Sequence, residues 1–175
     1  MVAMSPVPNP KDDPADLAAL AEHAAALVAA VDSALAPWVE RMVRTRWVAW
    51  SGEAPPPELI AAAAAAGERG RAEVTAALRD MLALDVESQR SNPLAIIRQA
   101  VVHPAGVLAS AGVPSVQRDA DAVRIFPEDH YDLSPASFAD LDAATHEAGV
   151  RWGAAKAHVI LARRRPSASG RASGC

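Results

Sequence analysis

The residues best suited to chemistry lie in one short string, Phe126-Pro-Glu-Asp-His-Tyr-Asp-Leu-Ser-Pro135. Its ionisable side chains could bind a metal ion or supply an acid–base pair, and they are Glu128, Asp129, His130 and Asp132. Ligands of a tetrahedral metal site normally come from separated elements at a defined spacing, which this string lacks. We therefore favour a surface loop whose acidic residues and Ser134 cap the next helix, with His130 and Tyr131 as candidates for contact with a partner.

No other motif in the sequence indicates catalysis. The five histidines form no His-Glu-x-x-His or Glu-x-x-His pattern, no serine lies in a Gly-x-Ser-x-Gly turn, and no glycine-rich loop suits a phosphate. Cys175 is the only cysteine, which excludes an internal disulfide and a cysteine metal cluster. The sequence thus predicts no metal site and no cofactor.

A second candidate is the string Trp152-Gly-Ala-Ala-Lys-Ala-His158. Trp152 and Lys156 are four residues apart, so they share a helix face and the ammonium can lie over the indole ring. Lys156 is the titratable residue of most interest. It is either a catalytic amine or, as we favour, the partner of an acidic residue in 119–149.

A third candidate combines tryptophan with arginine near residue 50. Trp47 and Trp50 are three residues apart, so they share a helix face, and Arg46 lies beside them. Both tryptophans could close the end of a helical hairpin as core residues. They could instead form an exposed aromatic patch suited to a protein interface, where Trp and Arg dominate binding energy; stacking on bases is the least favoured alternative.

Two long helical arms must position these residues. Asp13–Pro14 is typical of a helix start, and apolar residues recur every three or four positions from Leu17 to Met42. Pro37 should kink this arm or divide it near Ala36. A second helix is expected over about 58–87, with Gly67 and Gly70 inside it, where the first arm could approach closely and complete an antiparallel hairpin.

Shorter helices are expected to follow the hairpin. Asn92–Pro93 starts one that His103–Pro104 should interrupt, and the next should cover 104–111. A turn of helix is expected near 120–125, a short helix after Ser134–Pro135, and a last helix over about 149–164. The predicted organisation is a flexible leader over 1–13, one all-α domain over 14–165 and a disordered tail over 166–175.

Charge is strongly segregated along the chain. Residues 119–149 contain eight acidic residues and one basic residue, whereas 150–175 contain six basic residues and no acidic one. We favour an intramolecular arrangement, in which the last helix packs over the acidic segment. Alternatively, Arg163, Arg164 and Arg165 bind nucleic acid or another anionic surface, or both segments dock onto a protein partner.

Composition limits the class of protein. The chain has 175 residues, of which 42 are alanine, and this length suits one domain. No run of 18 large apolar residues is present, and the N-terminus has neither a basic region nor an apolar core. We therefore expect a cytoplasmic protein with no membrane span and no secretory signal.

Four strings resemble a family of small helical proteins from high-GC bacteria for which we know no activity. They are Arg90-Ser-Asn-Pro-Leu94, Ala111-Gly-Val-Pro114, Tyr131-Asp-Leu-Ser-Pro135 and Trp152-Gly-Ala-Ala-Lys-Ala-His158, and the resemblance covers about 37–165. It implies a helical fold and transfers no functional residue.

Taken together, these patterns predict a non-enzymatic interaction or regulatory protein that works through a helical surface. The expected partner is a protein, and a homo-oligomer is an open alternative. The second hypothesis is a nucleic-acid-associated regulator that uses the basic C-terminal end. The third is an enzyme with a carboxylate–histidine site in 126–135.

Overall fold

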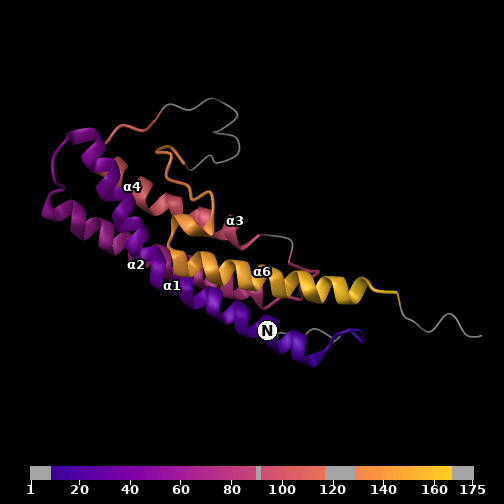
Figure 1. Ribbon diagram of the computed structural model, residues 1–175. Helices are drawn as coiled ribbons and strands as arrows, with labels where there is room; N and C mark the ends of the chain where they lie inside the picture. Colours follow the sequence, from indigo (N-terminus) through magenta and orange to yellow (C-terminus); the bar gives the residue numbers. More distant parts are fainter. Residues whose placement is uncertain (1–8, 90–91, 117–128, 167–175) are drawn as a thin grey trace, which may run out of the picture.

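The computed structural model describes residues 9–89, 92–116 and 129–166. Within these ranges the chain is helical and contains no strand, which confirms the all-α prediction (Figure 1). The elements are α1 (Pro14–Ser51), α2 (Pro57–Leu82), α3 (Pro93–Arg98), η1 (Gln99–Val101), α4 (Val102–Ser110), η2 (Phe138–Asp140) and α6 (Ala143–Arg164).

Helix α1 begins and ends as its caps dictate. The Asp13 side chain accepts a hydrogen bond from the backbone N–H of Ala15, and Pro14 occupies the first turn, where its missing N–H costs nothing. At the other end Gly52 adopts a left-handed φ of 72°, and its N–H donates to the carbonyl of Val48. The predicted start of the first arm is confirmed.

Of the two outcomes expected at Pro37, a kinked arm or a divided one, division does not occur, because α1 is one helix from Pro14 to Ser51. Pro37 and Ser33 are both exposed, so water can bind the Ser33 carbonyl that the proline leaves without a donor. The neighbours Ala36 and Trp38 are buried. Burial on both sides of the proline therefore stabilises the continuous helix.

Helices α1 and α2 form the predicted antiparallel hairpin, with close backbone contact at Gly67. A Cβ built on Gly67 would lie 3.0 Å from the carbonyl oxygen of Ala36 and 3.1 Å from its Cα. The second glycine serves another neighbour, since a Cβ on Gly70 would lie 2.8 Å from the His103 ring of α4. The expectation of a close approach to the first arm holds for Gly67 and not for Gly70.

We expect Gly67→Ala to lower the free energy of unfolding by about 1 kcal/mol. Overpacking costs about 1–3 kcal/mol, and the better helix propensity of alanine returns about 1 kcal/mol. The matched control is Gly153→Ala in α6, where a Cβ meets nothing within 4 Å and where we expect a gain of up to about 1 kcal/mol. Urea unfolding of both variants measures the difference, and equal effects would contradict close packing at Gly67.

Several boundaries differ from the sequence-based expectation. Helix α6 begins at Ala143 rather than 149, because the Asp142 side chain accepts a hydrogen bond from the N–H of Thr145 and caps the helix. Helix α2 ends at Leu82 rather than 87. The turn of helix expected near 120–125 lies outside the described residues.

The two proline-based boundaries after the hairpin were also placed wrongly. His103–Pro104 lies inside α4, and the interruption falls earlier, at η1. Pro104 is tolerated because it occupies the first turn of α4. Ser134–Pro135 is followed by the single 3-10 turn η2, which starts after Ser137, where Ser137 and Asp140 form a capping box.

Two clusters of buried side chains hold the helices together. The larger joins α1, α2, α3 and α6, and includes Leu27, Leu35, Trp38, Leu78, Ile97 and Trp152. The smaller lies toward the α1–α2 connection and includes Val43, Leu59, Leu108, Val113 and Tyr131. Helix α6 runs beside the α1–α2 hairpin, and α4 lies near the end where the hairpin turns (Figure 1).

Helix α1 meets the length and composition criteria for a membrane span, in contrast to the expectation from the sequence. An 18-residue stretch of α1 meets these criteria because it contains many alanines. The sequence-based expectation considered only runs of large apolar residues. A core helix of a soluble protein and an N-terminal signal sequence pass the same test. The absence of a membrane and the cytoplasmic location therefore stay predictions.

Candidate functional site

The last turns of α1 expose an aromatic and basic surface, which we call the Trp end and define as Arg44, Arg46, Trp47, Val48 and Trp50. The indole rings of Trp47 and Trp50 meet edge to face, with centroids 5.4 Å apart and planes inclined by 73°. Trp50 is 47% exposed and Val48 is 44% exposed. The shared face predicted for the two tryptophans is confirmed.

The sequence left open whether Trp47 and Trp50 are core or surface residues, and the two differ in burial. Trp47 is half-buried and packs against the smaller core cluster, so it acts as the base of the surface. Trp50 lies nearer the end of α1 and is exposed. Trp38, the other tryptophan of α1, is a core residue that is 1% exposed.

Polar donors accompany this apolar surface. Nε of Arg46 and Nε1 of Trp47 are buried and have no hydrogen-bond partner in the part of the chain that the structure describes. Arg44 is exposed and lines a shallow cleft with Ile60 of α2. The Trp end therefore combines apolar area with cationic and N–H donors, and lacks matching acceptors among the described residues.

The loop over 129–135 is held by local hydrogen bonds. The carboxylate of Asp129 is buried and accepts from the backbone N–H groups of Leu133 at 2.8 Å and Ser134 at 3.0 Å. The Tyr131 hydroxyl donates to the carbonyl of Val113 at 2.9 Å. Asp129 thus closes a turn, as expected of a capping carboxylate, although the turn leads to no α-helix.

His130 is exposed on this loop. Its side chain makes no hydrogen bond or ion pair within the described residues, and no group of three potential metal ligands occurs in them. Its backbone carbonyl accepts from the N–H of Val116 at 2.8 Å. Tyr131 is buried rather than available as a contact residue. Glu128 lies outside the described residues.

Trp152 and Lys156 adopt the predicted arrangement on α6. The Lys156 ammonium lies 5.0 Å from the centroid of the Trp152 ring, and Trp152 is buried. Partial burial lowers the pKa of Lys156. The ion pair that we favoured for Lys156 does not form with any carboxylate among residues 9–89, 92–116 and 129–166.

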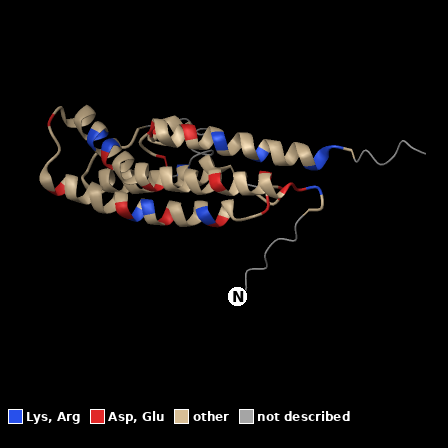
Figure 2. Ribbon diagram, turned by 60° about the horizontal axis from the view of Figure 1, so that its bottom comes forward, with Lys and Arg blue, Asp and Glu red and all other residues tan. Residues whose placement is uncertain are grey.

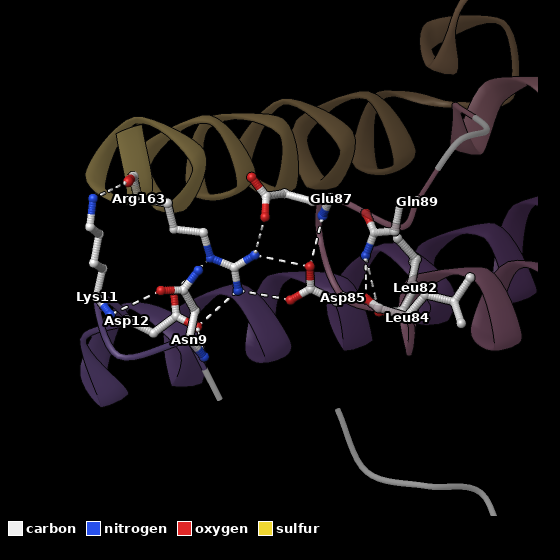
Figure 3. Close-up of polar contacts among 9 residues, drawn as sticks. All are labelled: Asn9, Lys11, Asp12, Leu82, Leu84, Asp85, Glu87, Gln89 and Arg163. Atoms are coloured by element: carbon white, nitrogen blue, oxygen red, sulfur yellow. Dashed lines mark hydrogen bonds and ion pairs between the residues drawn. The ribbon is translucent and has the colours of Figure 1, made fainter. Parts of the chain in front are cut away.

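The C-terminal end of α6 carries an ionic cluster around the buried Arg163 side chain, which we call the Arg163 clasp and define as Arg163, Asp12, Asp85 and Glu87 (Figure 3). Nε and Nη2 of Arg163 donate to the two oxygens of Asp12 at 2.7 and 2.8 Å. Nη1 and Nη2 donate to Asp85 at 2.9 and 2.8 Å, and Nη1 also donates to Glu87 at 3.3 Å. Figure 2 shows the basic C-terminal end of α6 in blue, with acidic positions in red nearby.

The clasp joins three segments that are far apart in the chain. The Arg163 side chain is 6% exposed and that of Asp12 is 4% exposed. Hydrogen bonds from Arg163 hold the pKa of Asp12 and that of Asp85 below the ordinary 3.8, and the same contacts, led by that with Asp85, raise the pKa of Arg163. Nζ of Lys11 adds two bonds, to the carbonyls of Arg163 and Arg165.

The clasp corrects our interpretation of the basic C-terminal end. Arg163 is paired intramolecularly, as the favoured interpretation required, but with residues 12, 85 and 87 rather than with the acidic segment 119–149. Arg164 and Arg165 are exposed. Sequence reasoning missed Lys11 and Asp12, which it had assigned to the leader. Their only local signal was a pair of charges beside a helix start.

None of the family models, curated proteins and solved structures compared with this chain matches it. The resemblance to a family of high-GC bacterial proteins therefore stays a prediction.

Proposed function

We propose that this chain is a protein-interaction module that binds its partner through the Trp end. The observation behind this proposal is that Trp50 and Val48 are 47% and 44% exposed at the end of a helix whose other tryptophans are half-buried or buried. Large apolar side chains in that position cost free energy in water unless a partner covers them. Tryptophan and arginine are also the residues that most often dominate binding at interfaces.

The chemistry of the Trp end favours a particular kind of partner. Arg44 and Arg46 flank the aromatic pair and form no ion pair within the described residues. A helix or loop that presents one large apolar side chain flanked by carboxylates would fill the apolar area and pair with both guanidinium groups. We therefore expect an acidic amphipathic segment of another protein as the partner.

The other two hypotheses find less support. Arg163 is engaged by three carboxylates, which leaves Arg164 and Arg165 as the exposed basic residues at the described end of α6, too few for strong phosphate binding. Asp129 is occupied by two backbone N–H groups, and His130 has no side-chain partner in the described region. Neither arrangement favours a nucleic-acid or an enzymatic role.

The proposal predicts that Trp50→Ala abolishes capture of the partner. Immobilised wild type, Trp50→Ala and Val150→Ala are incubated with native lysate and the bound proteins are identified; Val150 is the matched control because it is 57% exposed on α6. We expect one protein to bind wild type and Val150→Ala but not Trp50→Ala. Purified, it should bind Trp50→Ala about 30-fold more weakly than wild type.

An identical set of captured proteins for wild type and Trp50→Ala would contradict the proposal. The circular dichroism and melting temperature of Trp50→Ala should match those of wild type, because the side chain is half-exposed and outside both core clusters. Raising the salt concentration should weaken binding, since the expected partner is acidic.

A further inference from the structure

The hairpin carries an open groove at the end opposite the Trp end. A groove of about 620 Å³ lies between α1 and α2. Its floor is aliphatic and its margins contain one acidic and one basic side chain, and the residues that matter here are Ala21, Ala25, Val28, Leu82, Asp32 and Arg79. Trp47 and Trp50 are not part of it, so it is distinct from the proposed partner site.

The groove lies along a long apolar helix, α1. Helix α1 contains an apolar stretch of 18 residues, of which only 28% is buried by the described chain. Ala21, Ala25 and Ala29 are exposed, and Val28 is half-buried. Helix α6 and α4 cover other faces of the hairpin and contribute no residue to the groove. Apolar area of this extent on a helix favours a covering partner.

The charges at its margins are incompletely matched. Oδ1 of Asp32 accepts a hydrogen bond from Arg71 at 2.9 Å, whereas Oδ2 has no hydrogen bond within the described chain. Arg79 is exposed and forms no ion pair with any described carboxylate. One carboxylate oxygen of Asp32 and the guanidinium of Arg79, both without a partner among the described residues, thus flank the same apolar floor.

The helix register places these two charges at different levels of the groove. Gly67 lies against Ala36, and Arg71 lies against Asp32. A step of four residues toward the C-terminus of α2 therefore corresponds to a step of four residues toward the N-terminus of α1. Continuing this antiparallel register places Arg79 level with Ala24. Asp32 and Arg79 are therefore separated along the hairpin by about 12 Å, which is eight residues of helix rise.

From this arrangement we infer that the groove binds a second copy of this chain, with the two hairpins antiparallel around a two-fold axis near Val28. Such an axis carries each Asp32 toward Arg79 of the partner subunit, and it does so twice, because a two-fold contact is self-complementary. Exposed alanines on the floor allow the helices to approach to about 8 Å. The two hairpins would bury each other's aliphatic floors.

The first test measures association of the full-length protein by sedimentation velocity at concentrations up to about 100 μM. We expect wild type to be a dimer. Ala25→Arg places a charge on the floor of the groove, so this variant should be a monomer. Its dimer dissociation constant should be more than about tenfold higher than that of wild type. The matched control is Ala77→Arg, an exposed alanine of α2 outside the groove, which should stay dimeric. A monomeric wild type, or a dimeric Ala25→Arg, overturns the proposal.

The second test measures the charge pairs and does not depend on the floor. Arg79→Asp should raise the dissociation constant about fivefold at low salt and much less at high salt, because it sets like charges opposite each other twice. Arg69→Asp, an exposed arginine of α2 outside the groove, is the control and should leave it unchanged. Equal effects of the two substitutions would refute the antiparallel pairing.

The third test locates the two-fold axis. In a Cys175→Ser background, Val28→Cys should form a disulfide between two chains on mild oxidation, since equivalent residues at a two-fold axis face each other. Ala77→Cys should not. A failure of Val28→Cys to cross-link more than Ala77→Cys overturns the placement.

These outcomes also separate the inference from its alternatives. Trp50→Ala should remain dimeric, so a failed dimer and a failed Trp end are distinguishable. If wild type is monomeric but sediments with vesicles of neutral and anionic phospholipid, and Ala25→Arg does not, the groove faces a membrane and the proposed dimer is wrong.

Discussion

Replacing Arg163 with methionine is expected to lower the free energy of unfolding by about 3 kcal/mol, because the substitution leaves the Asp12 carboxylate buried without its counter-ion. Asp85 and Glu87 lose the same cation and then repel Asp12. For a chain of this length the melting temperature should fall by roughly 6–12 °C. Differential scanning calorimetry and urea unfolding measure both quantities.

The neighbouring arginine provides the control. Arg164 is exposed and one residue away, so Arg164→Met should change the free energy of unfolding by less than about 0.5 kcal/mol. Arg163→Lys should give an intermediate loss, because an ammonium cannot bind two carboxylates bidentately. Equal stability of Arg163→Met and Arg164→Met would show that the clasp does not stabilise the fold.

The clasp also determines how stability responds to acid. The pKa values of Asp12 and Asp85 are lowered in the folded state, so the unfolded chain binds more protons than the folded one below about pH 4. The contribution of these two carboxylates to the free energy of unfolding is complete above their ordinary pKa of 3.8. It is lost as the pH falls through their lower folded-state pKa values. The stability difference between wild type and Arg163→Met should therefore narrow below pH 4.

The second large effect is expected at Gly149, where α6 passes over the ring of Phe138. A Cβ on Gly149 would lie 2.4 Å from Cδ2 and 2.7 Å from Cε2 of that ring, closer than any real contact. Alanine there must expel the ring from its place against the core, and the lost burial exceeds the gain in helix propensity. We expect Gly149→Ala to lower the free energy of unfolding by about 2 kcal/mol.

A double-mutant cycle isolates the clash. In a Phe138→Ala background the same Gly149→Ala substitution meets no ring, so it should stabilise the protein by up to about 1 kcal/mol. Urea unfolding of the four proteins gives the coupling free energy. A destabilisation of the same size in both backgrounds would mean that the ring is not what excludes a side chain at Gly149.

The sequence predicts the helices well where a local signal exists. Asp13–Pro14 and Asn92–Pro93 both start helices, because a capping side chain and a proline at the first turn act within three residues. Pro37 does not divide the arm, which was one of the two expected outcomes, because the cost of a proline inside a helix depends on what surrounds it. Buried residues of α2 and α6 pack against α1 and stabilise it as a continuous helix across Pro37. A prediction from local sequence alone does not include this burial.

The candidate sites were less predictable, for the same physical reason. The sequence shows that Trp47 and Trp50 share a face, but their exposure depends on how far α1 extends past the smaller core cluster. Arg163 had several acidic segments available as partners. Its actual partners are 151, 78 and 76 residues away, and only the folded hairpin brings them together.

The central claim, that the Trp end binds a protein, is tested most directly by site-specific photo-cross-linking. A benzophenone amino acid replaces Ala49, which is exposed beside Trp50, and in a matched protein it replaces Ala154, which is exposed on α6. After illumination in native lysate, position 49 should give a discrete covalent adduct with one acidic partner protein, and position 154 should give none. Adducts of the same pattern from both positions, or no adduct from position 49, would contradict the account.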